Sequence, residues 1–461
     1  MPFDIRKLGA VGVMGIAITA CNSSDNNNNS ASTNTPGYST TSYQADFQSG
    51  IGENGSTVTY DVLVEAPTLD ANTLATSGIS AAPNDATGET FPAALTAETF
   101  YGAVDPAVAN GSAWWQGWTY INSTVDGMVP GADFHPLQSE IAGSTITPAG
   151  TNNCTTINSG FTDGGTVSVF GVSFPVCIVS NDITTNTTLT NDHVYLLNGN
   201  INVGDGQAQG GPSGNNNATV TVNAGTQIFG VDGSASALVV TRGSQIAING
   251  SAAQPVIMGA VAASTDGSGN VTGISGDPTD LTSRGQWGGL VLSGNGIDNA
   301  GDAMGELASE AVPTGQTRYF GGNDNTDSSG NVDYLIIAES GYAFRPNEEV
   351  QGLTVEAAGS GTSVDHLQVL GSEDDGVEFF GGAANATHVL INGADDDGLD
   401  FDEGYVGNIQ YAIVRQGSNN GDRGIEADNA GPSDDATPKS APNLANITIL
   451  GNSGKASTTT V

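Results

Sequence analysis

The sequence predicts an all-β fold in which short strands wind into a solenoid. Short β runs recur from about Thr187 onward, separated by Gly, Asn and Asp turns, and no amphipathic helix alternates with them. The segment that starts at His366 repeats itself at His388, 22 residues further on, and a third, looser copy starts at Gln410. A period in the low twenties, carried by short strands and Gly turns, is typical of a solenoid with one coil per repeat.

The N-terminus predicts export. Residues 1–20 have the pattern of a lipoprotein signal peptide, with Arg6 and Lys7 before an apolar run that is too short to span a membrane. The run ends in Ile-Thr-Ala-Cys, which resembles the bacterial lipobox and makes Cys21 the predicted site of lipidation. The alternative is an ordinary signal peptide in which this Cys occurs by chance. Asn22 follows, so the Asp-based signal for inner-membrane retention is absent.

A triacylated Cys21 would carry enough hydrocarbon for stable anchoring. We therefore expect an exported lipoprotein of the outer membrane, facing the periplasm or the cell exterior, with the membrane as a partner through Cys21. The polar, Asn-, Ser- and Thr-rich residues 21–42 cannot bury a core and are predicted to be a disordered tether.

Residues 43–150 are predicted to form a small mixed region that caps the solenoid. This region contains Trp114, Trp115 and Trp118, three of the four Trp residues of the chain. Such a cluster could be a platform on which sugars stack, or a hydrophobic plug that covers the end of the solenoid. We favour the plug, because a terminal coil must be covered.

Residues 151–461 are assigned to the solenoid itself. The predicted strands include Val194–Leu197, Ala218–Val222, Ala237–Val240, Ile246–Ile248, Pro255–Met258, Gly289–Leu292, Asp333–Ile337, Asp365–Val369, His388–Ile391, Gln410–Val414 and Asn446–Leu450.

Composition favours an acidic protein that works outside the cell. The chain has 10 Lys and Arg against 49 Asp and Glu, a net charge of −39, and 65 Gly. This charge argues against nucleic acid as a partner and favours cations. Of the three Cys, Cys21 is assigned to the lipid, which leaves Cys154 and Cys177. In an oxidising compartment these two would form a disulfide worth about 3 kcal/mol.

Each copy of the repeat places carboxylates at the same positions. Neighbouring coils lie about 4.8 Å apart, so equivalent carboxylates would stack in columns. Two unit charges at that distance repel by roughly 3–4 kcal/mol at an effective dielectric constant near 20, so the columns need a counter-ion. The predicted ligands are Asp374, Asp375, Glu378, Asp396, Asp397, Asp400, Asp402, Asp422, Glu426 and Asp428.

Ligands that offer only oxygen suit Ca²⁺ better than Zn²⁺, and we expect a structural calcium ion on these coils. The alternative is a solvated acidic ridge that binds ions only diffusely. Alternation along the strands predicts that Val377 and Phe379 point inward, and that Glu378, Asp400 and Glu426 form one outward column.

Four segments together resemble an uncharacterised family of exported bacterial lipoproteins. They begin at Val220 (VTVNAGTQIFG), Ser236 (SALVVTRGSQI), Arg284 (RGQWGGLVL) and Asp374 (DDGVEFFGG), and the likeness covers about residues 187–450. The resemblance implies a right-handed parallel β-helix, related in architecture to pectate lyases, and a surface location. It transfers no catalytic residue. Relatives are expected to continue past the end of this chain, which suggests a C-terminally truncated product.

Arg423 is the one candidate for catalysis. In pectate-lyase-like enzymes a Ca²⁺ ion neutralises a uronate while an Arg or Lys removes the C5 proton, and Arg423 lies beside the predicted acidic columns. The alternative, which we favour, is that Arg423 only pairs with carboxylates. His366 and His388 share an outward column with Gln410, which is either a stacked polar ladder or, less in keeping with a solenoid, a metal site.

Two hypotheses for the function follow. The first is a calcium-binding β-helix that acts as a binding, adhesion or structural module at the cell surface. The second is a calcium-dependent polysaccharide lyase or a glycoside hydrolase. The sequence leans away from an enzyme, because candidate acids and bases are scarce. A polysaccharide or another surface ligand remains a possible partner in both cases.

Overall fold

A computed structural model describes residues 146–450 with gaps at 170, 211–215, 279–280, 282, 314, 346–349, 417–420 and 430–434. It also describes residues 95–96, 98, 102–105, 108, 113–115 and 117–119, and the backbone of three short N-terminal strands. The predicted signal peptide, Cys21 and the tether lie almost entirely outside the described residues.

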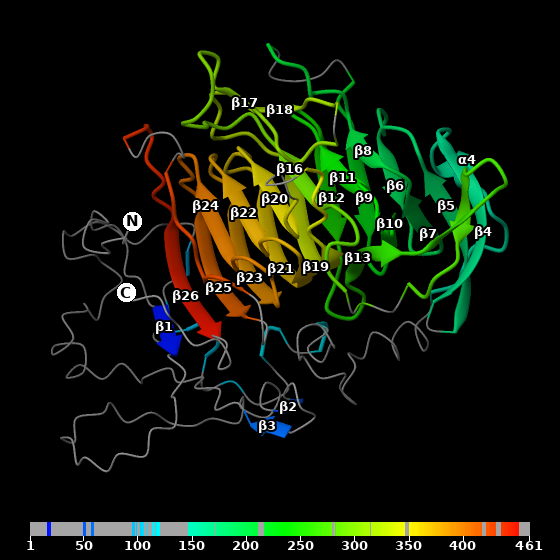
Figure 1. Ribbon diagram of the computed structural model, residues 1–461, viewed down its shortest axis with the longest axis horizontal. Helices are drawn as coiled ribbons and strands as arrows, with labels where there is room; N and C mark the ends of the chain where they lie inside the picture. Colours follow the sequence, from blue (N-terminus) through cyan, green and yellow to red (C-terminus); the bar gives the residue numbers. More distant parts are fainter. Residues whose placement is uncertain are drawn as a thin grey trace.

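The chain winds into a parallel β-helix whose coils have three faces (Figure 1). The first face contains β6 (Thr187–Leu189), β9 (Thr219–Asn223), β12 (Gln245–Asn249) and the start of β19 (Gly330–Ser340). The second contains β5 (Val172–Val179), β7 (Val194–Leu197), β10 (Gln227–Val231), β13 (Val256–Val261), the end of β19, and the ends of β21 (Ser363–Ser372), β23 (Asn385–Asn392), β25 (Asn408–Arg415) and β26 (Asn443–Leu450). The first residues of these four strands continue the first face. The third contains β8 (Asn200–Val203), β11 (Ala237–Val240), β16 (Gly289–Ser293), β20 (Leu353–Glu356), β22 (Val377–Phe380) and β24 (Leu399–Asp402).

Smaller elements are attached to these coils. Three antiparallel pairs lie outside the two large sheets: β2 (Ser49–Ile51) with β3 (Thr57–Thr59), β14 (Ala263–Thr265) with β15 (Val271–Ile274), and β17 (Glu306–Ala308) with β18 (Tyr319–Gly321). The N-terminal strand β1 (Ile16–Thr19) pairs in parallel with β26, the last strand of the chain. Within the described part of the chain, no helix has the length and hydropathy that a membrane crossing requires.

The long strands bend at one residue each, and this bend separates the first face from the second. Tyr334, His366, His388, Tyr411 and Asn446 have φ of 50°, 55°, 53°, 58° and 54°, in the left-handed region that bulky residues rarely adopt. The strand pairing passes over these residues in every coil. Each coil therefore turns a corner at the same place, with its side chain outside the core.

The core consists of apolar side chains stacked from coil to coil. Val377 pairs with Leu399 and Phe379 with Phe401, 22 positions further along the chain. All four side chains are at most 6% exposed, so the predicted inward alternation is confirmed. Burying side chains of this size contributes about 1.5–3 kcal/mol each, which is why the repeat keeps them at fixed positions.

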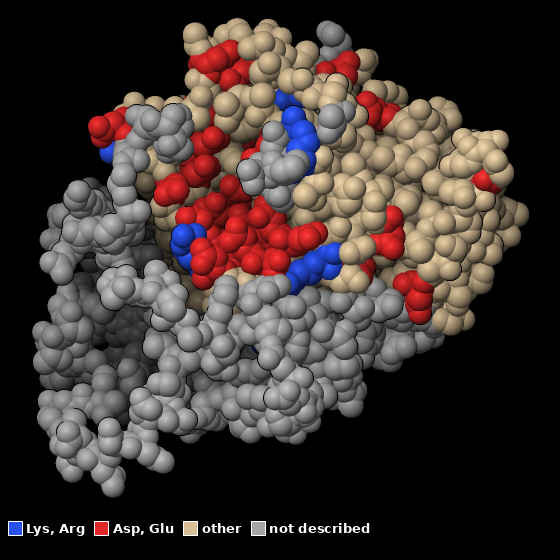
Figure 2. All heavy atoms as spheres, in the orientation of Figure 1, with Lys and Arg blue, Asp and Glu red and all other residues tan. Residues whose placement is uncertain are grey.

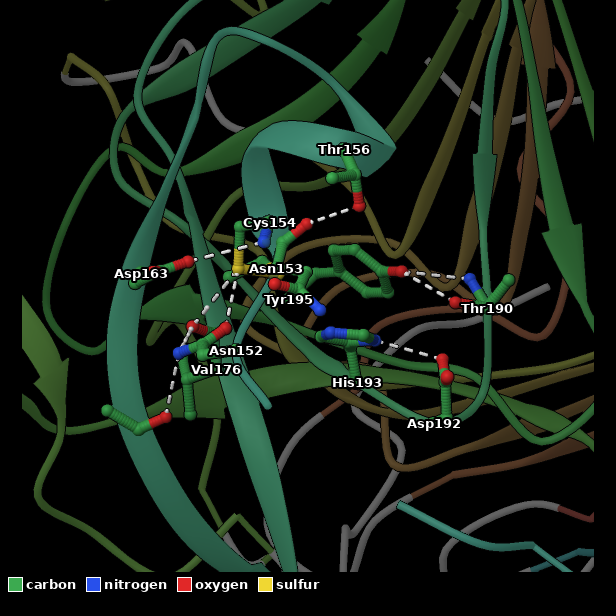
Figure 3. Close-up of a disulfide and its surroundings, with 12 residues drawn as sticks. Asn152, Asn153, Cys154, Thr156, Asp163, Val176, Thr190, Asp192, His193 and Tyr195 are labelled. Atoms are coloured by element: carbon green, nitrogen blue, oxygen red, sulfur yellow. Dashed lines mark hydrogen bonds and ion pairs between the residues drawn. A yellow bond between two sulfur atoms is a disulfide. The ribbon is translucent and has the colours of Figure 1, made fainter. Parts of the chain in front are cut away.

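A disulfide fastens the cap over the first coils. The short helix α4 (Cys154–Ile157) and β4 (Phe161–Val169) close this end, and Cys154 is bonded to Cys177 of β5 with a Cα–Cα distance of 5.3 Å (Figure 3). Phe161 packs edge-on against Tyr195, with ring centroids 6.2 Å apart, and both are buried. The predicted disulfide is thus present, and it joins the cap to the first full coil.

The Trp cluster does not cover an end of the solenoid, so this part of the prediction is wrong. Trp115 packs with Leu390 and Ile413 on the flank of β23 and β25. Trp118 is fully buried on the same flank, where its ring lies 5.3 Å from that of Tyr334. The reason is physical: the outward apolar residues of the second face need cover along its length, whereas α4 and β4 already cover the first coil.

Candidate metal centre

The acidic coils have the register that the repeat predicts. Gln351, Asp375, Asp397 and Arg423 occupy equivalent positions in four successive coils, because the glycine after each of the first three donates its N–H to the carbonyl of the next residue in the series. Asp375 Oδ1 accepts a hydrogen bond from Asp397 N at 2.8 Å, and Asp397 Oδ1 accepts one from Arg423 N. This column is therefore two carboxylates deep, with an amide at one end and a guanidinium at the other.

A second column runs along the outer side of the third face. Glu378 of β22 pairs with Asp400 of β24, and the bridge between Leu399 and Ile425 places Glu426 in the next coil beside Asp400. The predicted outward column is thus confirmed. Two residues further along these strands, the outward position is Phe380 in β22 and Asp402 in β24. The acidic residue at that position is therefore not repeated in both coils.

Three groups of carboxylates bring their oxygens within 4.8 Å of one another. Their members are Asp374, Asp375 and Asp396; Asp375, Glu378 and Asp400; and Asp396, Asp397 and Asp422. Seven of the ten predicted ligands belong to these groups. We call these seven residues together the carboxylate column. The other three, Asp402, Glu426 and Asp428, belong to none of them: Glu426 pairs with Arg423, and Asp402 lies further along the strand.

Burial distinguishes the middle of the carboxylate column from a solvated ridge, whereas Asp396 and Asp422 at its outer side are exposed. Asp397 is 1% exposed, and Asp375 and Glu378 are each 7% exposed. Gln351 Nε2 contacts both Asp374 Oδ2, at 3.2 Å, and Glu310 Oε1, at 3.5 Å, so the segment after β17 lies next to the column. Figure 2 shows the acidic side chains gathered into one patch in front of the coils that carry β20, β22 and β24, with basic side chains at its edges.

This environment opposes ionisation. Burial first, and then repulsion by Asp374 and Asp400, raises the pKa of Asp375 to about 10. Burial and neighbouring carboxylates raise the pKa of Asp397 to about 7 and that of Asp400 to about 6. Burial and Asp375 raise the pKa of Glu378 well above its usual range. Several of these carboxyl groups can be ionised at the same time only if a cation balances their charge.

The donor set fits a hard cation. It consists of carboxylate oxygens, the ligands that Ca²⁺ prefers, and no Cys or His belongs to the three groups. Asp400 Oδ1 is buried and has no hydrogen-bond donor among the described residues. An orphaned anionic oxygen in the interior is costly, and a bound ion would satisfy it.

Arg423 is engaged by acids on three sides. Its guanidinium lies 2.8 Å from Glu426 Oε2, 3.0 Å from Asp422 Oδ2 and 3.4 Å from Asp397 Oδ2. Burial lowers the pKa of Arg423, but the three carboxylates together raise it by more than burial lowers it, so the net shift is upward. The geometry therefore supports the favoured alternative, in which Arg423 pairs with carboxylates. This pairing keeps the guanidinium protonated, whereas a general base must lose its proton.

His366 and His388 form a stacked ladder. Their rings are 4.5 Å apart at an interplanar angle of 18°, with Tyr334 stacked on one side at 4.1 Å and Tyr411 on the other at 4.8 Å. Asp365 Oδ1 lies 3.0 Å from His366 Nδ1 and 2.7 Å from His388 Nδ1. One ligand atom from each of Asp365, His366 and His388 lies within 4.8 Å of the others. Asp365 Oδ1 itself occupies the point that both Nδ1 atoms approach, so the arrangement in the structure is a polar ladder.

Sequence reasoning missed the residues that surround the column from outside the repeat. Arg284 donates to Asp395 Oδ1 at 2.8 Å and to Gly393 O at 2.8 Å. Glu310 approaches from the segment after β17, and Arg318 pairs with the buried Glu356 at 3.5 Å. These residues sit in insertions with no counterpart in other coils, so periodicity could not place them. The scarcity of basic residues was the one available signal.

A family model described as a pectate-lyase-like β-helix domain matches residues 181–461. No curated protein and no solved structure matches the chain.

Proposed function

Because the chain belongs to the family of pectate-lyase-like β-helix domains, we propose that it uses this scaffold as an acidic, calcium-stabilised module outside the cell. In this proposal the protein is anchored in the outer membrane through a lipid on Cys21. It acts there as a binding, adhesion or structural module, with Ca²⁺ held by the carboxylate column.

The observation that carries the proposal is burial without compensation. Asp375, Glu378 and Asp397 are each at most 7% exposed, and the ion pair that the described part of the chain gives them is the one from Arg423 to Asp397, at 3.4 Å. Breaking even one buried ion pair costs about 3–5 kcal/mol, so several unbalanced carboxylates would be a heavy burden on a folded state. Bound Ca²⁺ removes that burden and makes these coils rigid.

Export and anchoring rest on the sequence. The lipobox-like Ile18–Cys21 follows a short apolar run, and the disulfide between Cys154 and Cys177 is of the kind that persists in oxidising compartments. Replacing Cys21 with Ser should release the protein from the membrane fraction. Membrane association equal to that of the parent, with no acyl group found by mass spectrometry, would refute the anchor.

Calcium binding is tested by titration calorimetry on the purified soluble chain. The double variant Asp397→Asn with Asp400→Asn removes one carboxylate from each of two ligand groups. It should weaken Ca²⁺ binding at least tenfold. Asp232→Asn with Asp435→Asn removes the same charge from two exposed positions outside the column and should leave the affinity within about twofold. If both double variants bind Ca²⁺ as the parent does, the column is not the site.

The alternative function is a calcium-dependent lyase or a hydrolase acting on polysaccharides. The observation in its favour is that the Arg423 side chain is 51% exposed at the edge of the group formed by Asp396, Asp397 and Asp422. An acidic sugar could meet a guanidinium and a bound ion there. Pectin, polygalacturonate and alginate should be assayed for unsaturated uronides, and other glycans for new reducing ends. Activity that Arg423→Gln abolishes would replace the module with an enzyme.

A further inference from the structure

Two of the three ligand groups in the carboxylate column share a residue. Asp375 belongs to the group with Asp374 and Asp396 and also to the group with Glu378 and Asp400. Within each group, the three oxygen atoms lie within 4.8 Å of one another. Oxygens bound to the same Ca²⁺ ion, each about 2.3–2.6 Å from it, are at most about 5 Å apart. Each group therefore has the dimensions to surround an ion of its own.

The two groups lie on different parts of the same pair of coils. Asp374 and Asp375 precede β22, and Asp396 precedes β24, so the first group lies in the turns before these strands. Glu378 and Asp400 are paired residues within β22 and β24, so the second group lies on the outer side of the third face. Asp375 is the residue whose carboxylate reaches both places.

The second group contains buried oxygens without a donor. Glu378 is 7% exposed, and in the described part of the chain neither an ion pair nor an N–H donor reaches its carboxylate. Asp400 Oδ1 is buried and has no hydrogen-bond partner there either. The two carboxyl groups lie within hydrogen-bonding reach of each other, but a proton shared between them would still leave Asp400 Oδ1 without a partner. A cation would be bound by both residues.

The charge of the first two groups exceeds what one divalent ion can balance. Together these groups contain five carboxylates. With all five ionised, one Ca²⁺ would leave three formal negative charges on coils that lie about 4.8 Å apart, whereas two ions would leave one. Two ions therefore match the charge of these groups better than a single ion does.

The third group already has a positive charge of its own. Its members are Asp396, Asp397 and Asp422. The guanidinium of Arg423 lies 3.0 Å from Asp422 Oδ2 and 3.4 Å from Asp397 Oδ2. A cationic side chain thus serves the last group of the column, and the first two groups are the ones left for metal ions.

We propose that the carboxylate column holds a dinuclear centre, in which two hard divalent cations of the Ca²⁺ type are bridged by the carboxylate of Asp375. One ion is bound by Asp375 with Asp374 and Asp396, and the other by Asp375 with Glu378 and Asp400. Water completes each shell, because Ca²⁺ takes about 6–8 oxygen ligands. This inference rests on the proposed function, since it specifies how many ions the column binds and which residue joins them.

A dinuclear centre would clamp two coils together at two points. Each ion takes ligands from the coil of β22 and from the coil of β24. An ion in one group also holds the Asp375 carboxylate in place for the other, so losing one ion weakens binding of the second. Asp374 and Glu378 each serve one ion, whereas Asp375 serves both, and this difference is what an experiment can measure.

The test counts bound Ca²⁺ in the purified chain by equilibrium dialysis, at the lowest free Ca²⁺ concentration that saturates the parent. Asp374→Asn and Glu378→Gln should each bind one ion fewer than the parent, and Asp375→Asn should bind two fewer. Asn and Gln have the shape of the protonated acids, so the buried positions stay filled. The surface control, Asp232→Asn with Asp435→Asn, should bind as many ions as the parent.

Lanthanide luminescence tests whether the two ions are neighbours. The parent loaded with a mixture of Tb³⁺ and Eu³⁺ should show energy transfer from Tb³⁺ to Eu³⁺, because this transfer requires two ions that lie close together. Asp375→Asn should abolish the transfer, and the surface control should retain it. Detection of the transfer needs only the parent, so this measurement does not depend on the folding of any variant.

Two results would overturn the dinuclear centre while the proposed function stands. The first is a parent without energy transfer, in which Asp374→Asn combined with Glu378→Gln removes only one ion. The second is a Glu378→Gln variant that binds as many ions as the parent, which would show that Glu378 and Asp400 share a proton instead. If neither these variants nor Asp397→Asn with Asp400→Asn lose any ion, the column binds no Ca²⁺ and the proposed function fails as well.

Discussion

Arg423 ends a column of acidic residues, because a basic residue stands where the repeat would place another Asp. It occupies the place that Asp375 and Asp397 take in the two preceding coils, and it contacts carboxylates of its own coil and of the previous one. A third Asp at this place would add a further buried like charge. A guanidinium instead neutralises the edge of the column, and the proposed metal ion would occupy its centre.

Arg423→Gln should destabilise the protein chiefly in the absence of metal. Asp397, 1% exposed, would lose its ion pair with Arg423, and we expect a loss of about 1–2 kcal/mol after allowing for the half-exposed Arg side chain. The melting temperature in EDTA should fall by a few degrees, and Ca²⁺ should restore part of the difference. Lys439→Gln, which removes an exposed cation, is the control. Equal effects of the two substitutions would show that the position of Arg423 is unimportant.

At the scale of the element, the ladder formed by Tyr334, His366, His388 and Tyr411 offsets an unfavourable backbone. Each of these residues has positive φ at the corner of a coil, which costs about 1–2 kcal/mol for a residue with a Cβ. Stacked aromatic pairs contribute about 0.5–1.5 kcal/mol beyond their burial, and each inner ring has two such neighbours. The ladder also supports Trp114, whose ring lies 5.3 Å from that of His388.

His388→Ala should therefore lower the free energy of unfolding by about 1–3 kcal/mol, because two stacking contacts are lost while the strained corner remains. His388→Gly should be the milder substitution, since glycine adopts positive φ without strain. Urea unfolding of both variants measures the difference. If Ala is tolerated better than Gly, backbone strain at the corner does not contribute as described.

The disulfide belongs to the cap and should affect its stability. It joins Cys154 and Cys177 across 23 positions, and removing it with Cys154→Ser and Cys177→Ser should cost about 3 kcal/mol. Chemical reduction of the parent should have the same effect on urea unfolding. A parent whose unfolding transition does not move on reduction would show that packing of Phe161 on Tyr195 alone holds the cap.

At the scale of the molecule, the sequence predicted what the period controls and missed what it does not. The strands, the inward stacks such as Phe379 on Phe401, and the register of Glu378 with Asp400 follow from the spacing of apolar residues. The burial of the column and the contribution of Glu310 come from insertions that depart from the period. Their sequence shows no repeat, so their position depends on tertiary contacts that a pattern cannot supply.

The metal-free protein should lose stability as the pH rises. Burial and repulsion raise the pKa of Asp397 to about 7, of Asp402 to about 9 and of Asp375 to about 10 in the folded state, against about 4 for an unfolded Asp. Such groups stabilise the folded state below the unfolded pKa, and this stability is lost as the pH rises through the folded pKa. In EDTA, the melting temperature should fall between pH 5 and pH 9.

The slope of that pH dependence has its own control. Asp397→Asn with Asp400→Asn should show a shallower fall than the parent, whereas Asp232→Asn with Asp435→Asn should follow the parent. Added Ca²⁺ should stabilise the parent more at pH 8 than at pH 5, because protons compete with the metal for carboxylates. A metal-free parent with the same melting temperature at pH 5 and pH 9 would contradict the buried charge described here.

Thermal unfolding at neutral pH and low ionic strength, with EDTA or with Ca²⁺, tests most directly whether the buried carboxylate column holds calcium. A ligand at about 100 times its dissociation constant stabilises the folded state by roughly 2.7 kcal/mol, so Ca²⁺ should raise the melting temperature by several degrees over EDTA. That gain should disappear largely in Asp397→Asn with Asp400→Asn. An unfolding transition that is the same in EDTA and in saturating Ca²⁺ would contradict the calcium-stabilised module and leave the parallel β-helix without a metal.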